Sequence, residues 1–150
     1  MVETSIKNPW QNCKASQEVF EERGILLLMR KRIGSFSERV IKTLNLDIPV
    51  RTPIYIADSN IEHMKSSHPS DYEKYKDQLP NIIANPDYVG KNIKDDSIEF
   101  TKEYFYNGEY VKVAIRVSSS NIYYARSMYV LNNNRVKNFI AKGTLKKLDS

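Results

Sequence analysis

Hydrophobic and polar residues alternate most clearly between residues 97 and 131, and this alternation predicts three antiparallel strands. The first two strands, 97–106 and 109–117, flank the pair Asn107-Gly108. This pair suits a two-residue hairpin loop, because both residue types readily adopt positive φ. A third strand, 122–131, follows after four polar residues, so the whole segment predicts a β-meander.

The register of the hairpin decides which side chains share a face. With a two-residue loop, Glu103 lies opposite Lys112 and Glu99 lies opposite Arg116. Pairs of opposite charge across two strands favour this register. It predicts a charged face, formed by these four side chains and Thr101, and an apolar face. The apolar face is expected to contain Ile98, Phe100, Tyr104, Val111, Val113, Ile115 and Val117.

The third strand can pair in two registers. A four-residue loop before it places Arg126 on the apolar face, whereas a shift of one residue places Ser127 and Tyr129 there instead. The two registers exclude each other, because a one-residue slip exchanges the faces of a strand. The sequence leaves both open.

Around the meander, helical periodicity and capping residues predict several helices and two short strands. His68 is expected to end one helix, because the residue before a proline avoids the helical region, and Pro69 is expected to begin the next. The helices are predicted at 17–32, 37–44, 59–68, 69–79 and 132–143, and the short strands at 53–57 and 88–89. The first helix is expected to end in the basic residues 30–32, and the helix at 69–79 to restart at Pro80.

The chain length of 150 residues suits one domain with a hydrophobic core. Residues 1–34 are predicted to form a partly helical N-terminal extension, and residues 35–150 the folded domain. The longest strongly apolar run, 25–29, is too short to cross a membrane, so we expect no membrane association. With no signal peptide evident, the expected location is the cytoplasm.

Cysteine and histidine are scarce. The single cysteine, Cys13, excludes an internal disulfide and any multi-cysteine metal site. The two histidines, His63 and His68, are five residues apart, which on a helix is a rotation of about 140°, so they do not share a face as a zinc pair would. No glycine-rich phosphate loop or dense carboxylate cluster occurs. We therefore expect neither a metal nor another cofactor.

Basic residues are concentrated in the last third of the chain. The net charge is +5, and residues 101–150 contain nine basic and three acidic residues. A basic face that also carries tyrosines is typical of RNA-binding proteins, because cations bind phosphates and rings stack on unpaired bases. Many basic domains bind no nucleic acid, however, and tyrosines in strands often serve only packing. Composition alone leaves both interpretations open.

The order of several short motifs resembles the phage-associated nuclease domains of the barnase/EndoU/colicin/RelE-like (BECR) superfamily. The resemblance covers about residues 36–148. Its most telling parts are two histidines after a short strand and an Asn-Pro-Asp turn before the meander. The motifs are IYIADSNIEH at 54–63, HPSDY at 68–72, LPNIIANPDY at 79–88, the hairpin, and YARSMY at 124–129.

The resemblance implies an α+β fold, with helices packed on one face of a small antiparallel β-meander sheet and RNA bound across the other. It also implies a metal-independent endoribonuclease of phage or toxin type, in which a ribose 2′-hydroxyl attacks the adjacent phosphate. That chemistry needs a base, an acid and cations, and histidine can serve as either of the first two. The implied catalytic residues are His63, His68, Arg116 and Ser127, and the implied RNA-binding residues are Lys112, Tyr124, Arg126 and Tyr129.

The expected partners follow from this interpretation. RNA, including tRNA, is the expected substrate, and an inhibitory immunity or antitoxin protein is the expected partner of a toxin. Two other functions agree with the same charge distribution. One is a non-catalytic RNA-binding module, and the other is a phage accessory protein whose basic face docks an acidic partner.

Overall fold

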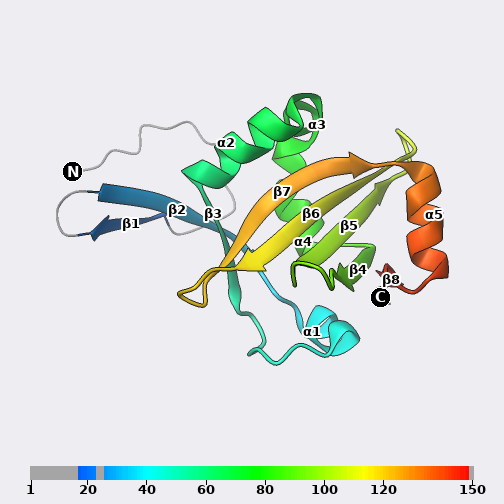
Figure 1. Ribbon diagram of the computed structural model, residues 1–150, viewed down its shortest axis with the longest axis horizontal. Coiled ribbons are helices and arrows are strands. Elements are labelled where there is room, and N and C mark those ends of the chain that lie inside the picture. Colours follow the sequence, from blue (N-terminus) through cyan, green and yellow to red (C-terminus); the bar gives the residue numbers. More distant parts are fainter. Residues whose placement is uncertain (1–16, 23–25, 149–150) are drawn as a thin grey trace.

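The computed structural model describes residues 17–22 and 26–148. Within these residues, eight strands form one sheet in the order β1-β2-β3-β7-β6-β5-β4-β8 (Figure 1). The strands are β1 (Gln17–Glu22), β2 (Leu26–Ser35), β3 (Pro53–Ala57), β4 (Tyr88–Lys91), β5 (Ile98–Tyr104), β6 (Glu109–Val117), β7 (Tyr123–Leu131) and β8 (Lys146–Lys147). The helices are α1 (Glu38–Leu44), α2 (Asp58–Ser67), α3 (Pro69–Tyr75), the 3₁₀ turn η2 (Lys76–Gln78), α4 (Leu79–Ala84) and α5 (Asn133–Ala141).

The fold is of the α+β class, as predicted, and strands β5, β6 and β7 form the predicted antiparallel meander. All neighbouring strands pair antiparallel except β3 and β7, which run parallel. That parallel pairing is short, because it joins only Ile54 to Tyr123 and Tyr55 to Tyr124. The chain then leaves β3 and enters α2, which packs beside β7.

The hairpin register differs from the prediction by two residues. Tyr104 pairs with Glu109, so the loop between β5 and β6 contains four residues rather than two, and Gly108 at its end has a φ of +65°. A shift of two residues preserves the faces of both strands. The predicted apolar face is therefore confirmed, with Val117 as an exposed exception. The predicted charge pairs are replaced by a diagonal ion pair between Lys112 and Glu99.

Neither predicted register of the third strand is correct. Ala125 pairs with Ile115 and Ser127 pairs with Ala114, so Arg126 is the extra residue of a β-bulge. Because of the bulge, the fully buried Ala125 and Met128 both contribute to the apolar face although they are three residues apart. The register therefore changes within the strand, whereas each of the two predicted registers was constant along it.

The helix predicted for residues 17–32 is wrong, because this segment forms the antiparallel strands β1 and β2. Strand β2 pairs with β3. Along it, Lys31 is buried, Arg32 is exposed and Ile33 is buried, and this alternation has the two-residue period of a strand. The basic residues therefore do not end a helix. The division into an extension and a domain at residue 34 stays a prediction, but β2 crosses that point within the same sheet. Residues 1–16 of the predicted extension lie outside the described residues.

The other predicted helices are confirmed, with small changes at their ends. The hydroxyl of Ser37 accepts a hydrogen bond from the Val40 amide and caps α1. Helix α2 begins at Asp58, one residue earlier than predicted, and ends where expected, so that His68 separates it from α3. Side chains of α1, α3 and α4 join the apolar face of the meander in one core. Helix α5 packs through Val136 against the opposite face, at the end of the sheet far from β1 (Figure 1).

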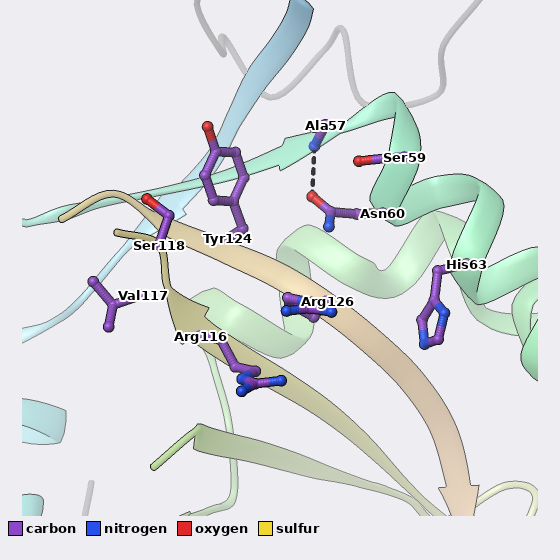
Figure 2. A pocket seen from close by; sticks show the side chains of 9 residues that line it. All are labelled: Ala57, Ser59, Asn60, His63, Arg116, Val117, Ser118, Tyr124 and Arg126. Atoms are coloured by element: carbon purple, nitrogen blue, oxygen red, sulfur yellow. Dashed lines mark hydrogen bonds between the residues drawn. The ribbon is translucent and has the colours of Figure 1, made fainter. Parts of the chain in front are cut away.

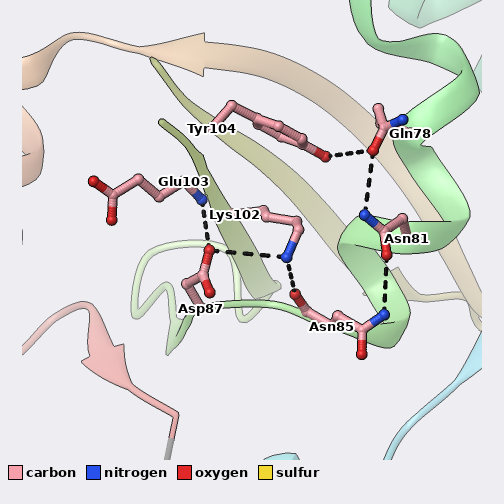
Figure 3. A network of polar contacts seen from close by, with 7 residues as sticks. All are labelled: Gln78, Asn81, Asn85, Asp87, Lys102, Glu103 and Tyr104. Atoms are coloured by element: carbon pink, nitrogen blue, oxygen red, sulfur yellow. Dashed lines mark hydrogen bonds and ion pairs between the residues drawn. The ribbon is translucent and has the colours of Figure 1, made fainter. Parts of the chain in front are cut away.

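A polar network attaches the predicted Asn-Pro-Asp turn to the meander (Figure 3). Lys102 Nζ donates to the carbonyl oxygen of Asn85 at 2.8 Å and lies 4.0 Å from Asp87 Oδ2, which accepts from the Glu103 amide at 2.7 Å. Nearby, Tyr104 donates to Gln78 Oε1 at 3.0 Å, and burial raises the pKa of its phenol to about 12. These contacts attach η2 and α4 to β5, so polar contacts as well as the apolar core join the helices to the sheet.

Glu109, at the start of β6, provides a test of how α3 is held on the sheet. Its carboxylate accepts hydrogen bonds from Tyr75 and from Lys74 at 2.9 Å, and these bonds hold its pKa below the ordinary value. A lowered folded-state pKa means that the carboxylate stabilises the fold above its unfolded pKa, and that this contribution is lost as the pH falls through the folded pKa. We expect Glu109→Gln to lower the free energy of unfolding at pH 7 by about 1 kcal/mol.

The same substitution should also flatten the decline of stability between about pH 5 and about pH 3, as measured by urea unfolding at each pH. Glu62→Gln, on the exposed surface of α2, is the matched control and should behave like the unmodified protein. If the free energy of unfolding of Glu109→Gln depended on pH as in the unmodified protein, the hydrogen bonds of Glu109 with Tyr75 and Lys74 would not contribute to stability.

Candidate active site

An open pocket of about 420 Å³ lies where the beginning of α2 meets the ends of β6 and β7 (Figure 2). It opens on the face of the sheet opposite the main core, since Arg116 follows the buried Ile115 on β6 and its pairing partner Tyr124 precedes the buried Ala125 on β7. The lining residues are Ala57, Ser59, Asn60, His63, Arg116, Val117, Ser118, Tyr124 and Arg126.

Three local features of the chain build this pocket. The strand β3 ends at Ala57, and Asn60 Oδ1 accepts a hydrogen bond from the Ala57 amide at 2.8 Å, which fixes the first turn of α2. His63 follows on the next turn, and Figure 2 shows its ring directed toward the strands. The bulge in β7 provides the third feature, because it lets Arg126 line the same pocket as Arg116.

The pocket is positively charged. Arg116 and Arg126 both contribute guanidinium groups, and no acidic side chain is among the described residues that line it. Guanidinium groups offer paired N–H donors that match two oxygens of a phosphate. The histidine adds a side chain of the type that most often serves as a general acid or base. His63 is exposed, and Ser67 Oγ lies 3.5 Å from each of its ring nitrogens. The arrangement suits an anionic substrate at which a proton must be moved.

The second histidine belongs to a different cluster. His68 lies in the break between α2 and α3, and its ring stacks on Tyr129 with 4.7 Å between centroids and 22° between planes. Lys112 Nζ lies 5.2 Å from the centroid of the same tyrosine and 3.1 Å from Glu99 Oε2. His68 itself is exposed and lies outside the pocket lining.

Lys112 and Glu99 form a buried ion pair, with only 10% and 8% of their side chains exposed. Burial by itself would lower the pKa of Lys112, but hydrogen bonding to Tyr129 and the attraction of Glu99 outweigh it and raise the pKa. The ammonium group is therefore charged, and Glu99 neutralises it locally. Lys112 was predicted to bind RNA, and that role stays a prediction for a cation that is buried and paired with Glu99.

A family model described as phage-Barnase-EndoU-ColicinE5/D-RelE like nuclease3 (PBECR3) matches residues 31–138. The chain belongs to this family. The match includes β3, α2 and the whole meander, and therefore every element that lines the pocket. Neither the curated proteins nor the solved structures gave a significant match.

Membership in the PBECR3 nuclease family confirms the predicted resemblance and makes nucleic acid the relevant class of substrate. Four predicted site residues lie together in the pocket, namely His63, Arg116, Tyr124 and Arg126. Three others, His68, Lys112 and Tyr129, lie together in the neighbouring cluster. Ser127 pairs with Ala114 beyond the bulge and does not line the pocket, so its role in this PBECR3 nuclease stays a prediction.

Several residues of the site were missed from the sequence. Ser59 and Asn60 follow a buried strand with only Asp58 between, and a polar pair in that position was a usable signal. Arg30 was not foreseeable in the same way, because its segment was expected to be helical. In the PBECR3 fold it stands on β2, where its guanidinium carbon lies 4.2 Å from the Tyr55 centroid. Its Nη1 also donates a long hydrogen bond of 3.5 Å to Tyr124 Oη.

The described part of this PBECR3 chain has neither a cluster of metal ligands nor a helix suited to cross a membrane. Residues 17–22 and 26–148 contain no group of three or more His, Cys, Asp or Glu side chains placed to hold a metal ion. None of the helices described in them has the length and apolar character that a membrane crossing requires.

Proposed function

We propose that the protein is a metal-independent endoribonuclease of phage or toxin type. The observation that carries this proposal is the pocket in which His63 stands with Arg116 and Arg126 and in which none of the described lining residues is a carboxylate. Membership in a nuclease family supports the substrate class. A metal-dependent nuclease would need ligands such as clustered carboxylates, whereas this pocket supplies cations of its own.

The chemistry that this pocket supports is an internal transfer within RNA. The two guanidinium groups bind the non-bridging oxygens of a phosphate and stabilise the additional negative charge of the transition state. His63 removes the proton from the neighbouring ribose 2′-hydroxyl, whose oxygen then forms a bond to phosphorus. The bond between phosphorus and the 5′-oxygen breaks, and that oxygen takes up a proton from water, to which the pocket is open. The products would be a 2′,3′-cyclic phosphate and a 5′-hydroxyl.

This mechanism also defines the substrate and the partners that we propose. DNA lacks the 2′-hydroxyl nucleophile, so the proposed reaction is restricted to RNA, with tRNA as one candidate. An inhibitory immunity or antitoxin protein remains a proposed partner. A partner that covers the two arginines would need an acidic surface, because a complementary charge offsets the cost of removing both cations from water.

The decisive experiment incubates purified protein with total RNA and with tRNA, with and without EDTA, and determines the ends of the fragments. We expect cleavage that persists in EDTA and leaves 2′,3′-cyclic phosphate ends. An oligonucleotide with one 2′-deoxy sugar at the cleavage position should resist. Loss of activity in EDTA, or 3′-hydroxyl ends, would overturn the mechanism. Binding without cleavage of any RNA would favour the non-catalytic RNA-binding module.

The dependence of RNA affinity on salt tests the role of the arginines. Each phosphate neutralised on a single strand contributes a slope of about 0.7 in log affinity against log salt concentration. We therefore expect Arg116→Ala and Arg126→Ala each to reduce the slope by about 0.7. Lys42→Ala, on the exposed surface of α1, is the control and should leave the slope unchanged. A slope that is equal in all four proteins would exclude these arginines as phosphate ligands.

A further inference from the structure

We propose that His68 is a base-stacking residue and that the substrate is an unpaired strand lying along β7, with one base on His68 and another on Tyr124. This inference rests on the proposed function, because it concerns the same nucleic-acid face. It assigns different roles to two histidines that the sequence treats alike. His63 acts on the ribose, and His68 holds a base.

The environment of His68 suits stacking. Its ring lies on Tyr129 at 4.7 Å and only 22° from parallel, which is the arrangement of two members of a stack. His68 is exposed while Tyr129 is half-buried, so the histidine forms the outer layer and the tyrosine supports it. The tyrosine in turn lies over the buried Lys112, which is paired with Glu99. A base can therefore extend an existing stack that is attached to the sheet.

The same environment does not suit proton transfer at the pocket. His68 lies beyond the end of α2, in the break before Pro69, and it is not among the residues that line the pocket. A general acid or base must come within hydrogen-bond distance of the proton that it transfers. His63, which lines the pocket together with both arginines, meets that condition better.

A second aromatic cluster lies at the other end of the pocket. Tyr124 lines the pocket, its ring lies 6.4 Å from that of Tyr55, and the guanidinium of Arg30 contacts both side chains. Arginine beside tyrosine rings is a frequent platform for bases, because it adds a cation–π contribution. Arg126 stands on β7 between Tyr124 and Tyr129. The phosphate site is thus flanked by one aromatic cluster on each side.

The spacing of these clusters identifies the class of RNA. Tyr124 and Tyr129 lie opposite Arg116 and Lys112, which are four residues apart on β6, so the two tyrosines are separated by roughly 13 Å along the strand. Neighbouring bases in a duplex strand stack on each other, so they are not free to stack on side chains this far apart. Bases that stack on aromatic residues must be splayed out, as in loops and single strands. We infer that the site takes unpaired RNA, such as a loop, and rejects a continuous duplex.

Steady-state kinetics on a loop-containing RNA test the role of His68. His68→Ala should raise KM by about 5- to 150-fold, the range found when a stacking side chain is truncated, and leave kcat nearly unchanged. His68→Phe keeps a ring that can stack but cannot transfer a proton. Unlike His68→Ala, it should therefore have a KM and a kcat close to those of the unmodified protein. A loss of about 10²-fold or more in kcat for His68→Phe would overturn the inference, because that result identifies a proton-transfer group.

A binding measurement separates this inference from the proposed reaction. The probe is a fully 2′-O-methylated single-stranded oligonucleotide, which cannot be cleaved through a 2′-hydroxyl, and the same oligonucleotide in a duplex. The single strand should bind more tightly, and His68→Ala and Tyr124→Leu should each weaken it by about 5- to 150-fold. Tyr106→Leu, an exposed tyrosine in the β5–β6 loop, is the control and should bind normally.

The outcomes of the two experiments are distinguishable. Normal binding by His68→Ala and Tyr124→Leu, or equal binding of the duplex, would overturn the stacking sites even if the protein cleaves RNA. Conversely, weakened binding by these variants, in a protein that cleaves no RNA, would support the stacking sites and reject the proposed reaction. Thermal unfolding of each variant, followed by circular dichroism, confirms that the loss of binding is local.

Discussion

Replacement of His63 by alanine should lower the rate of RNA cleavage by about 10²- to 10⁴-fold, the usual contribution of a general acid or base. His63 is exposed on α2, and its ring contacts Ser67 on the same helix, so the fold should hardly depend on it. The free energy of unfolding is therefore expected to change by less than about 0.5 kcal/mol. Single-turnover cleavage at saturating enzyme measures the chemical step without the contribution of binding.

The matched control for this experiment is His68→Phe, which removes the other histidine but should keep kcat. RNA affinity of His63→Ala should also remain within about threefold of the unmodified protein, because a general base contributes mainly to the transition state. Full activity of His63→Ala would contradict the proposed mechanism. Equal losses for the two histidine variants would instead indicate that both transfer protons.

The meander and its two faces were predictable from the sequence because they depend on local signals. Alternation along each strand separates the faces, and a two-residue error in the loop leaves that separation intact. The bulge at Arg126 was not predictable in this way. It depends on how β7 fits against β6, since Ile115 pairs with Ala125 and Ala114 with Ser127. The residue that the bulge adds is also the one that completes the arginine pair of the pocket.

The N-terminal strands show a second limit of local reasoning. The apolar residues of 26–29 and the basic residues that follow agree with a helix as well as with a strand. Pairing with β3, more than 20 residues away, decides the outcome. The error had a functional consequence, because Arg30 reaches Tyr55 and Tyr124 only when its segment is part of the sheet.

His63 and the two arginines of the pocket were found from the sequence because their residue types point to the chemistry. Their grouping was not found, because it depends on the path of α2 over β7. Lys112 illustrates the opposite case. Its alternation correctly places it on the face opposite the main core, but the environment there buries it against Glu99 and Tyr129. A cation on the correct face is therefore not necessarily available to a phosphate.

Lys112→Met should consequently act on stability before it acts on RNA binding. Removing one member of a buried ion pair leaves the other charge buried without a counterion, and the expected cost is about 3–5 kcal/mol in the free energy of unfolding. Glu99 would then retain only the hydrogen bond that Asn92 donates to it at 3.2 Å. Urea unfolding at pH 7 measures this loss directly.

The double variant Lys112→Met with Glu99→Gln distinguishes the two roles of Lys112. Glutamine keeps an acceptor for Asn92 and carries no charge, so the double variant should recover most of the lost stability. If Lys112 only supports Tyr129, the refolded double variant should bind single-stranded RNA with an unchanged salt slope. A slope reduced by about 0.7 in a stable double variant would show instead that Lys112 contacts a phosphate, as the sequence suggested. A single variant as stable as the unmodified protein would mean that the pair contributes little to the fold, and that the stack beneath His68 is supported by packing alone.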